Sequence, residues 1–273
     1  MRMADLRLPR WAGAAASALL ILASIAYGVA KGGHGPMIVG FLTDARDAAA
    51  KAAGFHIAAV SLSGEKQVSR AEIFAAAGVT DRASLLFLDV DGARARLKAI
   101  PWIADATVRK LYPDRLQITV TERDAFALWQ LDGKVSVISA DGTVVGGLAD
   151  WHFAHLPLVV GAGAAAQARD FLGMLDAHPD IRQQVRASVL VAQRRWNLKL
   201  KNGLDVRLPE ADVARALDTL AQLDRDKRLL TRDVTTIDLR LPDRVSVRLS
   251  DDAAQAREDV LKDKKVKRKG GDA

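Results

Sequence analysis

The chain has 273 residues, of which 49% are hydrophobic and 27% are charged, and its formal net charge is +7. It contains no cysteine, which excludes disulfides, thiolate catalysis and cysteine-ligated metals. Much of the positive charge is local, because Lys262 to Lys269 holds six basic residues and one acid. Elsewhere basic and acidic residues alternate without a basic groove, so the pattern does not favour nucleic-acid binding.

The N-terminal segment has the pattern of a membrane anchor. Residues 11–30 carry no charge, and three arginines precede them within residues 1–10. About 20 apolar residues at roughly 1.5 Å rise each cross a hydrocarbon core of about 30 Å. Because basic flanks favour the cytoplasmic side, we predict a cytoplasmic tail at 1–10, one transmembrane helix at 11–30, and export of the rest. A cleaved signal peptide is the alternative, although its apolar core would exceed the usual ~7–15 residues.

A breaker-rich stretch follows, and residues 31–54 are expected to form a linker with at most a short helix. Residues 55–123 then predict a small α+β domain. Ser69 and Glu72 form a capping box before one helix, and Asp89 is a plausible N-cap for a second. The expected order β-α-α-β-β consists of a strand at 57–63, helices at 70–77 and 89–100, and strands at 104–111 and 116–122.

Residues 124–250 predict a β-rich domain with one long helix, at 210–228, and a shorter helical pattern through Met174 and Leu175. Asp-Gly pairs and the Asn202-Gly203 pair mark hairpin turns. The expected strands are at 126–130, 135–139, 143–145, 188–193, 196–201, 204–208, 234–239 and 245–249. Residues 251–273 are expected to be a basic polar tail, so the whole chain reads as an α+β protein.

No pattern in the sequence predicts chemistry. His152 and His155 are the only close histidine pair, and no third metal ligand stands near them. The glycines around residue 161 lack the spacing and the preceding strand of a nucleotide-binding loop. No nucleophile motif is present either. We therefore predict no enzyme activity, no cofactor, no metal and no small-molecule substrate.

Several segments together resemble one family. The run Leu97-Lys-Ala-Ile-Pro-Trp-Ile103 is followed by Ala106-Thr-Val-Arg-Lys-Leu-Tyr-Pro-Asp-Arg-Leu116 and by Ile118-Thr-Val-Thr-Glu-Arg123. These runs, with Ala127-Leu-Trp129 and Ile237-Asp-Leu-Arg-Leu-Pro242, are similar to the signature of the FtsQ/DivIB family. The resemblance covers roughly residues 11 to 250. It implies that residues 55–123 form a POTRA (polypeptide-transport-associated) domain.

The resemblance also implies a function. It points to a non-catalytic scaffold of bacterial cell division in the inner membrane, with most of its mass in the periplasm and located at the division septum. The implied partners are FtsB-like and FtsL-like proteins, through which septal wall synthesis is regulated. A POTRA-bearing secretion or membrane-assembly factor is the alternative, because POTRA domains also occur there. A wall-modifying hydrolase is a third, weaker possibility.

The final predicted strand is the candidate site. A strand at 245–249 placed at a sheet edge would accept a partner's strand by β-augmentation. The resemblance puts Arg240, Leu241 and Leu249 where partner contacts are expected, and the strand adds Val245 and Val247. The alternative is an ordinary terminal strand whose Leu241 and Leu249 face the core.

Overall fold

The structure is a computed structural model that describes residues 12–31, 35–147 and 151–259. The predicted tail at 1–10 and the basic run Lys262 to Lys269 lie outside these residues. The chain divides into two compact units. One comprises Met1–Ala99 with Asp105–Thr121, and the other comprises Ile100–Ala104 with Glu122–Ala273.

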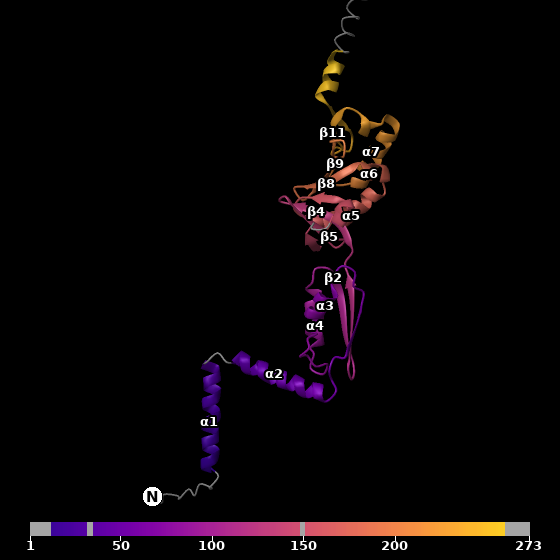
Figure 1. Ribbon diagram of the computed structural model, residues 1–273. Coiled ribbons are helices and arrows are strands. Elements are labelled where there is room, and N and C mark those ends of the chain that lie inside the picture. Colours follow the sequence, from indigo (N-terminus) through magenta and orange to yellow (C-terminus); the bar gives the residue numbers. More distant parts are fainter. Residues whose placement is uncertain (1–11, 32–34, 148–150, 260–273) are drawn as a thin grey trace, which may run out of the picture. The chain divides into compact units, whose positions relative to one another are not determined.

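Two helices precede the first strand: α1 (Ala12–Lys31) and α2 (Gly35–Ala52) (Figure 1). The apolar segment therefore forms a helix. No helix within the described ranges is both long and apolar enough to cross a membrane. The expected linker at 31–54 is mostly helical, and the last turns of α2 pack on the first unit. There Ala50 is buried, and the Ser84 hydroxyl donates a hydrogen bond to Asp47.

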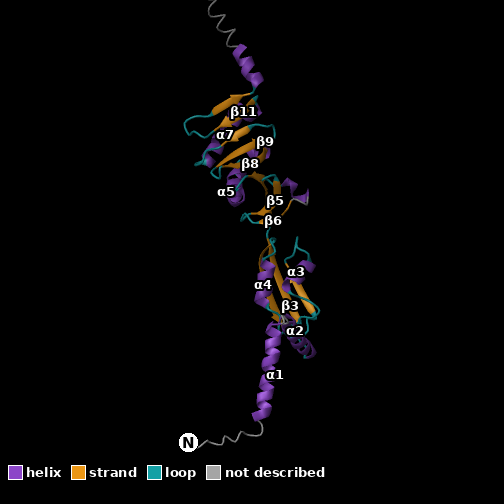
Figure 2. Ribbon diagram, turned by 90° about the vertical axis from the view of Figure 1, so that its left-hand side faces the viewer, coloured by secondary structure: helices purple, strands orange, loops and turns teal. Residues whose placement is uncertain are grey.

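The first unit has the predicted β-α-α-β-β order. Its elements are β1 (Ala59–Ser63), α3 (Arg70–Ala77), α4 (Val90–Lys98), β2 (Ile103–Leu111) and β3 (Arg115–Glu122). The sheet order is β1-β3-β2, with β1 parallel to β3, and α3 and α4 lie alongside it (Figure 2). Both predicted N-caps are confirmed: the Ser69 hydroxyl accepts from the Glu72 amide at 3.2 Å, and Asp89 accepts from the Gly92 amide at 3.0 Å.

The second unit is built on one sheet of nine strands, in the order β12-β11-β10-β9-β8-β7-β4-β5-β6. The strands are β4 (Ala125–Leu131), β5 (Lys134–Ser139), β6 (Val144–Gly147), β7 (Leu158–Val160), β8 (Val185–Val191), β9 (Arg195–Leu200), β10 (Asp205–Arg207), β11 (Val234–Asp238) and β12 (Ser246–Leu249). The β-rich domain that the sequence pattern predicts is therefore present.

Helices supply the other half of the core of this unit. They are α5 (Ala164–Asp176), α6 (Pro179–Gln184) and α7 (Val213–Lys227), with short 3₁₀ helices at Trp151–His155 and Leu229–Thr231. Phe171 of α5 stacks on Trp196 of β9, with ring centroids 4.2 Å apart at 13°. The expectation of a single long helix was wrong, because α5 and α7 have similar lengths and both present buried apolar side chains to the sheet.

Three elements of the second unit were not predicted. β7 has only three residues, too few to show an alternating pattern, and it pairs in parallel with both β4 and β8. α6 follows the break at His178-Pro179, with Pro179 in its first turn. Residues 251–259 are helical rather than an irregular tail, and the Ser250 hydroxyl caps them by accepting from the Ala253 amide at 3.2 Å.

Residues Ile100–Ala104, which run from the end of α4 into the first two residues of β2, belong to the second unit. Trp102 stacks on Phe153, with centroids 5.9 Å apart at 29°. The Arg123 guanidinium donates to the carbonyl oxygens of Pro101 at 3.0 Å and Ile103 at 2.5 Å. Trp102 is thus a packing residue.

Candidate partner-binding site

β12 is the last strand of the nine-stranded sheet, and among the described residues only β11 pairs with it. The Ser250 amide donates to the Asp233 carbonyl at 3.0 Å, so this amide points toward the β11 side. Because successive backbone groups alternate in direction along a strand, the amides of Val247 and Leu249 point to the open side. This edge presents unpaired donors and acceptors that another strand can satisfy.

The apolar side chains of β12 continue the core to the edge of the sheet. Val247 stands opposite Ile237, which is fully buried, so the two side chains share the core-facing side. Val245 packs against the same core and is half-buried, as is Leu249. Val247 is 41% exposed at the rim. An added strand would therefore find apolar contacts beside its backbone partners.

An ion pair stands beside the start of this edge. Arg240 donates to the Asp238 carboxylate from Nε at 2.9 Å and from Nη2 at 2.6 Å. The hydrogen bond from Arg240 is the main cause that holds the pKa of Asp238 below its usual value, and Asp238 in turn raises the pKa of Arg240. Arg207 adds a longer contact of 3.9 Å to Asp238. The guanidinium of Arg240 is therefore held in place while its side chain stays 40% exposed.

A groove of about 530 Å³ adjoins the edge strand. Residues 209–212, which precede α7, form one wall together with Arg215, Ala216 and Thr219 of α7, and residues 239–245 form the other. The predicted residues Arg240, Leu241 and Val245 line this groove together, whereas Val247 and Leu249 lie on the neighbouring strand. Leu241 is 48% exposed, whereas Leu249 is half-buried. The structure thus places the five predicted residues along one edge strand and the groove beside it.

Some residues of this site had only weak signals in the sequence. Asp238 and Arg240 lie two positions apart at the end of a strand, which puts their side chains on one side. Their ion pair could have been predicted from this spacing. The sequence did not predict that residues of α7 such as Arg215 and Thr219 line the groove, because helical periodicity does not show which loop packs against a helix.

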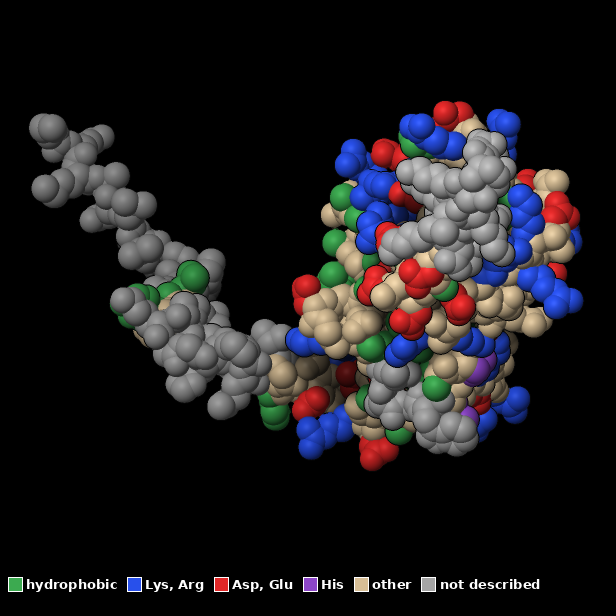
Figure 3. Space-filling view, turned by 90° about the horizontal axis from the view of Figure 1, so that it is seen from above, with side chains coloured by type: hydrophobic (Ala, Val, Ile, Leu, Met, Phe, Trp, Pro, Cys, Tyr) green, Lys and Arg blue, Asp and Glu red, His purple; other side chains and the backbone are tan. Residues whose placement is uncertain are grey.

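Figure 3 shows that basic and acidic side chains are interspersed on the face in view. Within the described ranges, no group of three or more histidine, aspartate or glutamate side chains is placed to hold a metal ion. The Nδ1 atom of His155 lies 2.7 Å from the carbonyl oxygen of His152, so these residues contact each other through one backbone group.

Two family models match the chain. A model described as "POTRA domain, FtsQ-type" matches residues 55–123. A second model, described as "Cell division protein FtsQ/DivIB, C-terminal", matches residues 127–240. The second match ends at Arg240, before β12.

Curated relatives are similar over most of the chain. A protein of Bradyrhizobium diazoefficiens is 53% identical over 97% of this chain and 78% of its own length. One of Agrobacterium fabrum is 40% identical over 86% of this chain and 72% of its own length. One of Rhizobium meliloti is 40% identical over 93% of this chain and 80% of its own length. All three relatives are named cell division protein FtsQ.

Proposed function

Because this chain belongs to the FtsQ/DivIB family of cell division proteins, we propose that its β12 edge binds an FtsB-like partner by strand addition. The protein is a non-enzymatic component of the divisome. Family membership decides between the predicted functions in favour of cell division over secretion or membrane assembly. The proposal concerns the partner, which is FtsB-like, and the mode of binding, which is strand addition.

The observation that carries the proposal is the open edge of β12. The amides of Val247 and Leu249 point away from β11, and Val247 offers apolar surface on the core-facing side. A partner strand would form main-chain hydrogen bonds with these amides and side-chain contacts with Val247. The adjoining groove with Arg240 and Leu241 would receive the residues that precede or follow the added strand. A carboxylate on the partner would suit the exposed side of the Arg240 guanidinium.

The proposal places the protein in the inner membrane at the division septum. Residues 11–30 would cross the bilayer, with the N-terminus in the cytoplasm and both units in the periplasm. The support is the uncharged run with three arginines before it. Such a tether would raise the effective concentration of the edge strand toward FtsB-like and FtsL-like partners that are themselves membrane-bound.

Truncation of the full-length chain tests the proposal. Deleting residues 245–273 removes β12 and should abolish co-purification with FtsB-like and FtsL-like proteins from cells. Deleting only residues 260–273 leaves β12 intact and is the matched control. Both variants should remain in the membrane fraction, and their thermal unfolding should be measured so that loss of binding is not loss of the fold. Co-purification that survives the longer deletion would refute strand addition at β12.

A second measurement tests the location. A fluorescent fusion that tolerates export should gather at midcell, whereas an even distribution around the envelope would contradict the septal assignment. The shorter deletion should gather at midcell as the full chain does.

A further inference from the structure

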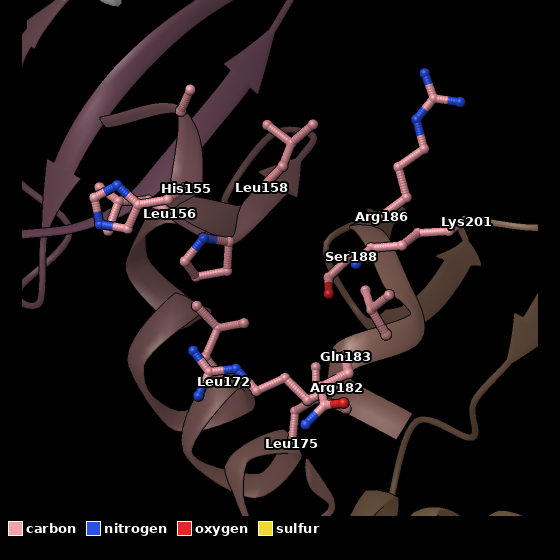
Figure 4. Close-up of a pocket in the computed structure, with 13 residues that line it drawn as sticks. His155, Leu156, Leu158, Leu172, Leu175, Arg182, Gln183, Arg186, Ser188 and Lys201 are labelled. Atoms are coloured by element: carbon pink, nitrogen blue, oxygen red, sulfur yellow. The ribbon is translucent and has the colours of Figure 1, made fainter. Parts of the chain in front are cut away.

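A second hollow lies on a different part of the second unit. It has a volume of about 470 Å³, within the range of ligand pockets. It is bordered by residues 154–158, by one side of α5, and by the stretch from α6 into β8 (Figure 4). Its apolar wall consists of Leu156, Pro157, Leu158, Leu172, Leu175 and Val185. None of its lining residues belongs to the β12 edge or to the groove beside it.

The charged residues around this hollow all have one sign. Arg182, Arg186 and Lys201 line it, and none of the described aspartates or glutamates does. Arg182 is paired with Asp176, but Arg186 and Lys201 make no ion pair with any residue that the structure describes. The Arg186 side chain extends outward at the mouth (Figure 4). An occupant with a carboxylate would therefore be attracted and held.

A buried hydroxyl faces the same hollow. Ser188 is 1% exposed, and its side chain is directed from β8 into the hollow (Figure 4). It makes no hydrogen bond with another described side chain or backbone group. The hydroxyl is therefore available to form a hydrogen bond with a ligand in the hollow.

The backbone beside Ser188 has an open edge as well. The short strand β7 pairs with β8 only at Ser188 and Val189. Among the described residues, 186–187 of β8 therefore have a neighbouring strand on one side only, β9, whereas the Val185 amide donates to the carbonyl oxygens of Ile181 and Arg182 in α6. Polar backbone groups of an unpaired strand segment are satisfied by an extended polypeptide more completely than by a compact ligand.

We propose that this hollow binds an extended acidic segment of a partner protein, which pairs with residues 186–187 of β8. Its carboxylate would lie near Lys201 and Arg186, a polar group would meet the Ser188 hydroxyl, and its apolar side chains would pack on Leu158 and Leu172. The site is separate from β12, so it does not depend on strand addition there.

Amide hydrogen exchange of the full-length chain in nanodiscs tests this proposal. The probe is a pool of capped hexapeptides in which glutamate alternates with valine or leucine. Exchange of residues 186–187 should slow at least fivefold when the pool is added. Lys201→Glu with Arg186→Glu should weaken the binding at least tenfold. Lys134→Glu with Arg169→Glu, which makes the same charge change at exposed sites outside the hollow, should leave it unchanged.

Two further arms test the hydrogen bonds. Ser188→Ala removes the hydroxyl with little change in volume and should weaken binding about threefold to tenfold. A pool with alternate amides N-methylated should not protect residues 186–187. Equal protection by this pool, by a pool with lysine in place of glutamate, or in the double charge-reversal variant would overturn the proposal, as would no protection by the acidic pool. The thermal unfolding midpoint of each variant shows whether it is folded.

Discussion

Replacing Val247 by proline removes one outward-pointing amide from the edge of β12. The change should leave pairing with β11 intact, because that pairing uses the amides that alternate with Val247, such as that of Ser250. A lost hydrogen bond costs about 0.5–1.5 kcal/mol, and the partner carbonyl left without a donor adds about 1–3 kcal/mol if it is buried. At 1.4 kcal/mol for each factor of ten, the partner's affinity should fall about tenfold to a thousandfold.

The assay is titration of the full-length variant in nanodiscs with the periplasmic part of an FtsB-like partner. Val247→Ala is the matched control, since it trims the half-exposed side chain and keeps the amide; it should lose less than about tenfold. Ser246→Pro is the opposite case, because the alternation directs its amide toward β11, and it should lower the stability of the second unit. If Val247→Pro bound the partner as tightly as Val247→Ala, the outward amide would have no part in binding and strand addition would be refuted.

Three further predictions concern stability. Arg240 lowers the pKa of Asp238, so the pair stabilises the fold above the unfolded pKa of about 3.9, and this stabilisation is lost as pH falls through the lower folded pKa. Asp238→Asn should cost about 0.5–1 kcal/mol in urea unfolding at pH 7, and a difference undiminished in strong acid would contradict this. Gly64→Ala should cost more than about 3 kcal/mol, because its φ is +90° and a Cβ would lie 1.9 Å from a backbone oxygen of β3. Gly54→Ala, at φ +95° with no atom within 4 Å, should cost only about 1 kcal/mol, so similar losses would argue against the close approach. Phe171→Ala should cost about 3–5 kcal/mol and alter the near-ultraviolet circular dichroism of its stacked tryptophan; a loss below about 1 kcal/mol would refute tight packing there.

The local patterns of the sequence predicted much of the first unit. Ser69, Asp89 and Gly78 mark helix ends through single hydrogen bonds or a positive φ, which depend on neighbouring residues alone. β7 could not be predicted in the same way. Its three residues form a strand because β4 and β8, distant in the sequence, flank them in the fold. A three-residue strand that forms through such tertiary pairing is too short to show an alternating hydrophobic pattern in the sequence.

The site was only partly predictable from the sequence, because part of it depends on tertiary packing. Residues 245–249 were expected at a sheet edge as the last predicted strand, and the structure places β12 at the end of its sheet. The groove beside Leu241 was not predictable, since it depends on where α7 packs relative to residues 239–245. The direction of each amide along β12 also depends on the register with β11, which the sequence alone leaves open.

The residues around Trp102 bear on how this protein can be divided for experiments. The second unit includes Ile100–Ala104, which end in the first two residues of β2. Arg123 and Phe153 hold that segment through hydrogen bonds to its carbonyl groups and ring stacking on Trp102. A fragment cut at residue 124 would expose Phe153 and the apolar side chains of β4 and β5 next to it. Each unit is built from two separate stretches of the chain, so a single cut cannot release either unit whole.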